Sequence, residues 1–284
     1  MFSVVPSVAE ETFWVDGVAN AQVPPDDRGL SLADGVFETL RVEFGVISCR
    51  SRHAQRLSRG LEVLNFPTAS QTALALIDEA ERVLRRSVSE ASGTLRLTVT
   101  RGSGPRGYKV PVHQTPRSIL RFSPGLANAE PASQLTISGV RWSSQPFFQG
   151  CKLLARTEQV MALEEARARG FADAIMCDSS GSWVSTTSGN FFLRIGDCLI
   201  TPPVNEAGIA GTRRQAILDH WANFLGYQVK VRKLTAEDIV SAQEAWSCNS
   251  VRGICRIAAV DNYTFTEATA SEALSAYIHQ EGAL

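Results

Sequence analysis

The sequence predicts a two-domain α+β protein, and three observations support this fold class. A chain of 284 residues is long enough for two domains that each have a hydrophobic core. Short strand-like segments are numerous in both halves, and the helical segments do not alternate regularly with them, which is typical of α+β folds. Residues 123–133, between the halves, are rich in small and loop-forming residues. We therefore expect an N-terminal α+β domain at 1–122, a linker at 123–133 and a C-terminal domain at 134–284.

In the first half, predicted strands surround two predicted helices. A hairpin is expected at Phe13–Asn20, because the Asp16-Gly17 pair favours a two-residue turn. Apolar residues recur at helical spacing over Ser70–Ser87, which predicts a helix there. The other expected elements of this half are strands on both sides of Glu43–Gly45, a helix at His53–Leu64, and strands at Thr94–Thr100 and Arg117–Phe122.

The second half combines strands with helices that carry end signals. Thr212–Leu225 is expected as a helix that ends at Gly226, and Thr235–Asp238 has the pattern of a capping box. The other expected helices are Glu158–Gly170 and Glu267–Gln280, and strands are expected at Gln134–Trp142, Ala174–Cys177, Trp183–Val184, Phe191–Leu193, Cys198–Ile200 and around Asn249-Ser250.

Composition excludes several classes of protein. The formal net charge is −1 without a basic run, which argues against a nucleic-acid-binding surface. No uninterrupted apolar segment is long enough to span a membrane, and the N-terminus lacks the pattern of a secretory signal. The six cysteines include no Cys-x-x-Cys pair, and the four histidines have no metal-ligand spacing. We expect a cytoplasmic protein with reduced cysteines and no metal site.

Lys152 differs from the other three lysines in its surroundings. Lys230 and Lys233 belong to an alternating stretch that places them on the wet face of a strand, whereas Lys152 lies between Cys151 and Leu153. Apolar surroundings disfavour the charged form of a lysine, which leaves an amine that can form a Schiff base or take a proton. The alternative is a lysine at a strand end that extends its ammonium group into water.

Several motifs together resemble the class IV aminotransferases, a family of pyridoxal-phosphate (PLP) enzymes. The family includes branched-chain aminotransferases, D-amino-acid aminotransferases and 4-amino-4-deoxychorismate lyases. The resemblance covers about residues 13–260 and implies the fold type IV architecture of D-amino-acid aminotransferases, with the site at the domain interface of a homodimer. The motifs, in the family's order, are Asp27–Leu30, Asp34–Thr39, His53–Leu57, Arg101–Tyr108, the Lys152 segment, Ser188–Phe192 and Gly208–Arg214.

The resemblance assigns cofactor roles to residues in both halves. Lys152 is the residue that binds the cofactor aldehyde, and Asn190 belongs to a cofactor-binding turn. The amides of Thr212 and Arg213, at the start of a helix, and the hydroxyl of Ser250 are expected to hold the phosphate. Arg56 is expected to add a charge-assisted bond to the phosphate. The alternatives are a surface arginine at 56 and an ordinary turn serine at 250.

The sequence departs from the family's pattern at two positions. Most members have a glutamate five residues before the asparagine of the cofactor turn, where it keeps the pyridine nitrogen protonated, and here that residue is Ser185. A hydroxyl can bond to this nitrogen but stabilises a pyridinium less than a carboxylate does. This departure disfavours transamination more than elimination. The second departure is Ala33, which stands where a glycine is usual.

The Arg106-Gly107-Tyr108 loop favours the lyases among the family members. D-amino-acid aminotransferases have a histidine at the position of Tyr108, and Arg156, Glu158 and Gln159 are also similar to the lyases. Arg106 and Tyr108 are expected to bind substrate. The resemblance thus implies conversion of 4-amino-4-deoxychorismate to 4-aminobenzoate and pyruvate, with Lys152 moving the proton. An aminotransferase acting on D-amino acids, branched-chain amino acids or amines, and a PLP-binding homologue with little catalysis, remain as alternatives.

Overall fold

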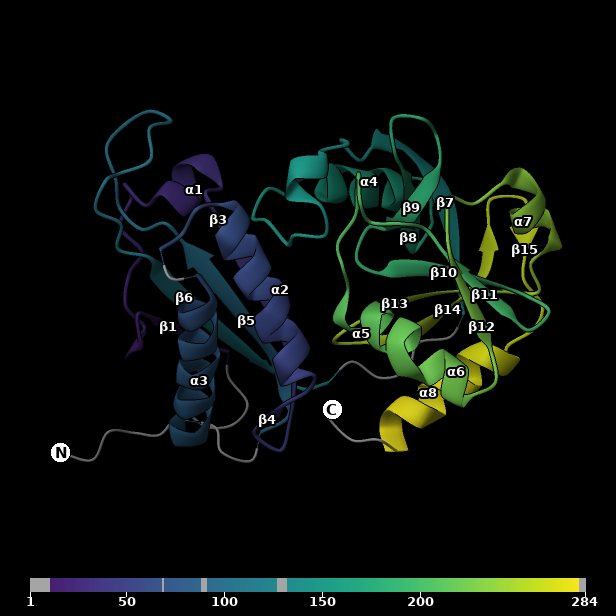
Figure 1. Cartoon of the computed structure of the whole chain (residues 1–284), viewed down its shortest axis with the longest axis horizontal. Coiled ribbons are helices and arrows are strands. Elements are labelled where there is room, and N and C mark those ends of the chain that lie inside the picture. The colour runs from purple at the N-terminus through teal and green to yellow at the C-terminus, as the bar shows by residue number, and fades with distance from the viewer. Residues whose placement is uncertain (1–10, 68, 88–90, 127–131, 281–284) are drawn as a thin grey trace. The chain divides into compact units, whose positions relative to one another are not determined.

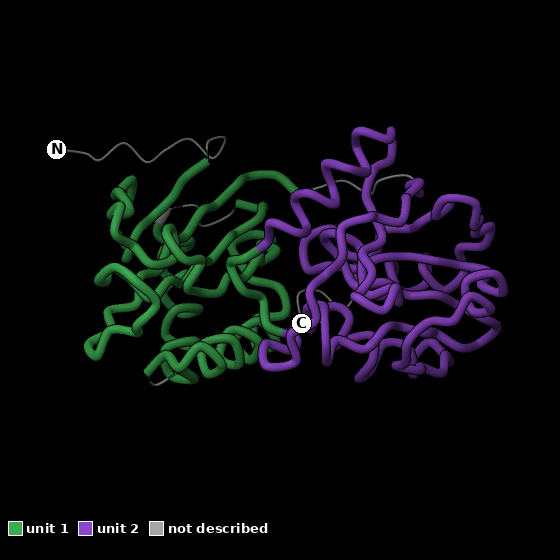
Figure 2. Tube along the Cα trace, turned by 90° about the horizontal axis from the view of Figure 1, so that it is seen from above, with its two compact units in different colours: residues 1–127, 151–155, 283–284 green, residues 128–150, 156–282 purple. Residues whose placement is uncertain are grey.

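The computed structural model of the chain describes residues 11–67, 69–87, 91–126 and 132–280. The chain divides into two compact units, as Figure 2 shows. The described residues before 128, together with Cys151–Ala155, form unit 1, and residues 132–150 and 156–280 form unit 2. The sequence prediction assigned all of 134–284 to the second domain. The structure differs at Cys151–Ala155 because the backbone of this segment pairs with a strand of unit 1. Residues 127–131 of the predicted linker lie outside the described residues.

Unit 1 is an antiparallel sheet covered by two helices on one face (Figure 1). Its six described strands have the spatial order β2-β1-β6-β5-β3-β4. The strands are β1 (Thr12–Val15), β2 (Val18–Ala19), β3 (Gly35–Glu43), β4 (Val46–Ile47), β5 (Gly93–Thr100) and β6 (Arg117–Pro124), and the helices are α1 (Arg28–Leu32), α2 (Arg50–Val63) and α3 (Ala69–Ser87). The expected strands and helices of this half are thus present, and the short helix α1 was not predicted.

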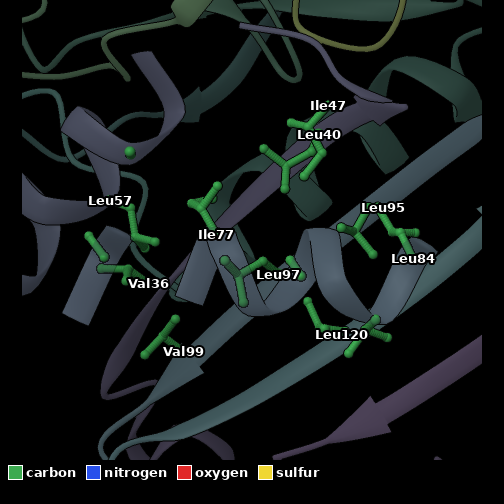
Figure 3. Close-up of a cluster of buried hydrophobic side chains, with 14 of the residues drawn as sticks. Val36, Leu40, Ile47, Leu57, Ile77, Leu84, Leu95, Leu97, Val99 and Leu120 are labelled. Carbon is green, nitrogen blue, oxygen red and sulfur yellow. The ribbon is translucent and has the colours of Figure 1, made fainter. Parts of the chain in front are cut away.

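The core of unit 1 lies between the sheet and helices α2 and α3 (Figure 3). Alternate residues of β3 enter this core, because successive side chains of a strand point to opposite faces. The helix α2 comes so near to β3 at Gly60 that a Cβ atom there would lie 2.9 Å from Cγ1 of Val36. Glu38 lies on this same core-facing side of β3 and is 1% exposed. A buried carboxylate on an apolar face needs hydrogen-bond or charged partners, and those of Glu38 include Arg56, a candidate site residue.

Unit 2 is a mixed nine-stranded sheet within the described residues, in which β9 pairs with both β8 and β10. This pairing closes strands β10, β13, β14, β7, β8 and β9 into a ring, and it joins Ser185 to Asn190. The strands are β7 (Ser133–Arg141), β8 (Asp173–Cys177), β9 (Trp183–Thr186), β10 (Asn190–Ile195), β11 (Cys198–Thr201), β12 (Gln228–Val231), β13 (Glu244–Asn249), β14 (Gly253–Val260) and β15 (Tyr263–Thr264). Ser185 and Asn190, the two residues paired where the ring closes, are both residues for which the sequence predicts a contact with the cofactor.

Two hydrophobic cores lie on opposite faces of the unit 2 strands. Phe191 and Phe192 are neighbours on β10 and enter different cores, as the alternation of a strand requires. The ring of Phe192 stacks on Trp246 with 5.5 Å between the ring centroids. The helices of this unit are α4 (Thr157–Ala168), α5 (Thr212–Ala216), α6 (Ala222–Phe224), α7 (Ala236–Ser241) and α8 (Thr269–Gln280), with a 3₁₀ turn at Pro146–Phe148.

The helix predicted at Thr212–Leu225 contains a π-helical turn that the sequence did not indicate. Residues Ile217–Trp221 form this turn between α5 and α6, and the helical stretch ends before Gly226, which has a φ of +81°. The capping box at Thr235 is confirmed, since both of its hydrogen bonds are present. Among the described residues, no helix combines the length and the apolar character that crossing a membrane requires.

Candidate active site

Lys152 lies beside an aromatic ring on the face of β3 opposite to the helices. Its backbone carbonyl accepts a hydrogen bond from the amide of Phe37 at 2.9 Å, and its Nζ lies 4.4 Å from the centroid of the Phe37 ring. Cys151 is buried, and Leu153 packs against the core of unit 1. The side chain is therefore partly buried and held over an aromatic face, an arrangement that attracts a cation while removing part of its water.

Gly150, two residues before Lys152, is bonded to the loop that precedes α5. Gly150 forms a parallel bridge with Ile209, and its carbonyl accepts a hydrogen bond from the amide of Ala210 at 3.0 Å. Gly150 has a φ of +71°, and a Cβ atom there would lie 3.0 Å from the Cβ of Ala210, so both backbone conformation and space favour glycine. Two peptide bonds separate Gly150 from Lys152, which keeps their Cα atoms within about 7 Å.

Arg56 is held by the buried carboxylate of Glu38. Arg56 donates from Nε to Oε1 of Glu38 at 2.8 Å, and its Nη2 makes a second bond to Oε2. Nδ1 of His53, which is fully buried, lies 2.7 Å from the same Oε2. Burial by itself raises the pKa of Glu38, but the charge and hydrogen bonds of Arg56 and the bond to His53 outweigh it and lower the pKa to about 2. Glu38 is therefore a charged anchor that fixes the guanidinium plane of Arg56.

Two buried polar atoms at the start of α5 lack partners. Thr212 and Arg213 are 3% and 4% exposed, and neither Oγ1 of Thr212 nor Nε of Arg213 has a hydrogen-bond partner among the described residues. Buried polar groups are nearly always paired, so unpaired donors at a helix start indicate a place for an anion. The neighbouring Arg214 is as buried but donates to the carbonyl of Pro202 at 3.0 Å. These residues fit a phosphate group, because they supply donors and positive charge without an acid.

Asn190 braces this helix start. Its Nδ2 donates to the carbonyl of Ile209 at 2.8 Å, and a Cβ atom at Gly211 would lie 2.0 Å from its Oδ1. Gly211 is therefore required by close packing against Asn190. The predicted contact of Asn190 with the cofactor stays a prediction, and its geometry shows that it positions the loop before Thr212.

Ser185 uses its hydroxyl hydrogen within its own strand. The residue is 3% exposed, and its Oγ donates to the carbonyl of Thr186 at 2.7 Å. With the hydrogen engaged, Oγ offers lone pairs and therefore acts as an acceptor toward any further group. Ser185 carries no negative charge, which is the property that a glutamate at this position would supply.

Ser250 lies in the turn between β13 and β14, and Asn249 shapes this turn. Oδ1 of Asn249 accepts hydrogen bonds from the amides of Val251 at 3.0 Å and Arg252 at 2.8 Å. Nη2 of Arg252 donates to Oγ of Ser188 at 2.6 Å, so the turn is joined to the one that precedes Asn190. Asn249 and Arg252 are not among the site residues that the sequence predicts. The signal for Asn249 was an asparagine at a strand end, which commonly caps the following turn.

Arg106 and Tyr108 lie in an exposed loop of unit 1 after β5. Tyr108 is 89% exposed, and Arg106 is also exposed. The structure thus places Lys152, Arg56, Arg106 and Tyr108 in unit 1. In unit 2 it pairs Ser185 with Asn190, bonds Asn190 to the loop before Thr212 and Arg213, and joins the turn of Ser250 to the turn before Asn190.

Comparison with known proteins shows which family and which fold the chain is similar to. The family model described as amino-transferase class IV matches residues 35–260. An aminodeoxychorismate lyase of Vibrio harveyi is 30% identical over 87% of this chain and 91% of its own length. The crystal structure of 4-amino-4-deoxychorismate lyase from Pseudomonas aeruginosa matches with a TM-score of 0.87 and 31% identity, over 96% of this chain and 100% of that one. A hypothetical aminotransferase from Mycobacterium tuberculosis, in a PLP-bound form, has the same fold, with a TM-score of 0.79 and 22% identity over 95% and 100% of the two chains.

Proposed function

The chain belongs to the class IV aminotransferase family, and from this premise we propose that it is a PLP-dependent lyase that converts 4-amino-4-deoxychorismate to 4-aminobenzoate and pyruvate. The observation that carries this choice is Ser185, whose hydroxyl is bonded to the carbonyl of Thr186 and offers no negative charge. Elimination that forms an aromatic ring has its own driving force and depends less on such a charge than transamination does. The two lyases, at 30% and 31% identity, support the same choice.

The cofactor roles in this proposal are those that the family resemblance assigns. Lys152 would bind the cofactor covalently, and Oγ1 of Thr212, Nε of Arg213 and the hydroxyl of Ser250 would donate to its phosphate. Arg56, oriented by Glu38, adds a positive charge. When bound, PLP supplies an aldehyde that captures the substrate amine and a ring that withdraws electrons from the breaking bond.

Lys152 is the proton carrier of the proposed reaction. Its free amine would take the proton from the amine-bearing carbon of the substrate. The bond between the neighbouring ring carbon and the enolpyruvyl oxygen then breaks, which makes the ring aromatic. Lys152 returns the proton to the departing enolpyruvate, which becomes pyruvate. The proton and electron balance closes without a second substrate, whereas an aminotransferase needs a 2-oxo acid.

A homodimer is the assembly that we propose, and exposed apolar side chains of unit 1 support it. Leu30 on α1 is 70% exposed, and Tyr108 and Val112 of the adjoining loop are 89% and 84% exposed. Exposed apolar groups that lie on neighbouring segments favour association. Sedimentation at micromolar concentration should give about twice the 30.8 kDa chain mass, and Tyr108→Ser with Val112→Ser should shift the protein toward the monomer.

The deciding experiment follows both products from 4-amino-4-deoxychorismate. The purified protein with PLP should release 4-aminobenzoate and pyruvate in equal amounts without any 2-oxo acid. Lys152→Ala should lose this activity by several decades and should not be labelled when borohydride reduction is followed by mass spectrometry of the peptide that holds residue 152. Turnover only with an added 2-oxo acid would instead establish an aminotransferase. Covalent PLP at Lys152 without turnover of either kind would leave a cofactor-binding homologue.

A further inference from the structure

The loop that carries Arg106 and Tyr108 is held near its ends: Ser103 and Gly104 donate to Asp26, and Arg101 donates to Gln114. It leaves β5 at Thr100 and returns to β6 at Arg117, and residues 105–110 are exposed. Exposed side chains do not hold a loop in one conformation, since they retain their rotational freedom. A loop that presents two residues to a substrate needs an anchor from elsewhere.

Arg28 provides that anchor between the two residues. Its Nη1 donates to the carbonyl of Gly107 at 3.0 Å. Of the residues that the structure describes, only Arg28 makes a hydrogen bond to the segment 105–112. Gly107 has a φ of +92°, a conformation that glycine adopts without strain, so its carbonyl can turn toward Arg28.

Arg28 is itself held firmly. It is 3% exposed, its amide donates to the carbonyl of Gly102 at 2.9 Å, and its Nε donates to Oδ2 of Asp34 at 2.9 Å. Arg101 donates to both oxygens of Asp34, from Nε at 2.8 Å and from Nη2 at 3.0 Å. Burial raises the pKa of Asp34, but the hydrogen bonds of Arg101 and Arg28 outweigh it and lower the pKa. A charged Asp34 therefore fixes the guanidinium of Arg28.

The aliphatic part of the Arg28 side chain also packs against the loop. A Cβ atom at Gly104 would lie 2.8 Å from Cδ of Arg28, so the loop backbone packs against the arginine side chain there. The planar guanidinium places Nε at Asp34 and Nη1 at Gly107 at the same time. A lysine has one nitrogen at the end of its chain and cannot reproduce both bonds in this geometry.

We propose that Arg28 is a positioning residue that sets Arg106 and Tyr108 for substrate binding through the carbonyl of the glycine between them. The proposal rests on the proposed function in so far as that function assigns Arg106 and Tyr108 to the substrate. Arg28 touches neither substrate nor cofactor, and its effect therefore falls on substrate affinity rather than on the proton-transfer step.

Two matched variants test this role. Arg28→Lys keeps a positive charge near Asp34 but loses the bond to Gly107. Arg117→Lys makes the same change at an arginine that bonds to the buried Asp27 and does not touch the segment 105–112. Arg28→Lys should raise KM for the amino substrate about tenfold, with kcat within about twofold of wild type. Arg117→Lys should leave KM unchanged, and PLP binding should be the same in all three proteins.

Hydrogen exchange supplies a readout that does not depend on turnover. Amides of residues 103–112 should exchange faster in Arg28→Lys than in wild type or Arg117→Lys. In a background that carries both Arg106→Ala and Tyr108→Ala, Arg28→Lys should have little further effect on KM, because the residues that it positions are gone. Equal exchange in all three proteins, or additive KM effects, would overturn the proposal. If the amino substrate is an amino acid that needs a 2-oxo acid, the lyase function fails, while the same KM comparison with that substrate still tests Arg28.

Discussion

Two buried glutamates, one in each unit, have similar surroundings and different tasks. Glu38 and Glu244 are each 1% exposed, and each accepts a hydrogen bond from Nε of an arginine, Arg56 and Arg194 respectively. The other partner of Glu38 is the side chain of His53. Glu244 also accepts from the amides of Ala270 and Ser271, both at 3.0 Å, and from the hydroxyl of Ser271 at 2.9 Å, all in the first turn of α8.

The partners decide what each carboxylate does. Backbone amides at a helix start belong to the fold, so Glu244 stabilises the attachment of α8 and interacts favourably with its dipole. Side-chain partners have rotational freedom of their own, so Glu38 fixes the orientation of Arg56, the residue that the proposed function assigns to the cofactor phosphate. The difference teaches that burial and an arginine partner do not by themselves distinguish a structural carboxylate from one that serves a site.

The largest effect is expected from removing the charge of Glu244. Glu244→Gln should lower the free energy of unfolding by about 3–5 kcal/mol, because the buried Arg194 loses the buried one of its two carboxylate partners and keeps only the exposed Glu267, and because the cap of α8 is weakened. Urea denaturation measures the change. The folded fraction of the variant should keep the PLP affinity of the wild type. A selective loss of PLP affinity would break the distinction between the two glutamates.

Glu38→Gln should destabilise the protein by about 3 kcal/mol and should also weaken PLP binding about tenfold or more, since Arg56 loses its orienting partner. Titration of the apoprotein with PLP, under conditions where the variant is folded, measures the second effect. His53→Gln is the matched control: it keeps a donor near Glu38 without touching Arg56. Unchanged PLP affinity in Glu38→Gln would show that Glu38 is structural, as Glu244 is.

Lowering the pH should remove the stabilising effect of the Glu38 carboxylate. The pKa of Glu38 is lowered from 4.5 to about 2, so its stabilising effect is complete above pH 4.5 and is lost as the pH falls toward 2. The difference in free energy of unfolding between wild type and Glu38→Gln should therefore shrink by about 2 kcal/mol between pH 7 and pH 3. Urea denaturation of both proteins at each pH tests this. A difference that is constant over this range would contradict the charged state of Glu38.

Ser185→Glu would place a carboxylate at a buried position of β9, where the serine hydroxyl now bonds to a backbone carbonyl. In the proposed site its charge would favour the protonated form of the cofactor ring nitrogen. A hydrogen bond to a charged group contributes about 1.5–3 kcal/mol, so the ratio of transamination to pyruvate release should rise by about one to two decades. Ser185→Gln, of equal size and without charge, is the control. An unchanged ratio in a folded, PLP-binding Ser185→Glu would show that residue 185 does not face the ring nitrogen.

The smallest effect concerns backbone conformation rather than charge. Ala33 ends α1 with a φ of +53°, in the left-handed region where a Cβ atom is strained. Ala33→Gly should relieve this strain and raise the free energy of unfolding by about 0.5–1 kcal/mol after the greater freedom of glycine in the unfolded chain is included. Thermal denaturation at pH 7 should show a small increase in Tm. A decrease would mean that the left-handed conformation at Ala33 carries no strain.

Local patterns predicted much of the fold because they depend on near neighbours. The hairpin at Asp16-Gly17 is confirmed, and both residues have the positive φ values that a two-residue turn requires. The capping box at Thr235 and the helix over α3 are confirmed for the same reason, since three- and four-residue spacings are visible in the sequence. The motifs around Lys152 also predicted the family.

The sequence by itself therefore determined most of the elements, the family and the choice of candidate residues, because these follow from local spacing and from motif order; helix α1 and the π-helical turn did not follow from it. Only the tertiary structure decided which distant groups meet: Glu38 with Arg56, and Arg28 with Gly107, 79 residues away. It also decided that the hydroxyl of Ser185 bonds to Thr186. Neither periodicity nor composition encodes such pairs, because a hydrogen bond depends on the positions of two atoms in space and not on their separation along the chain.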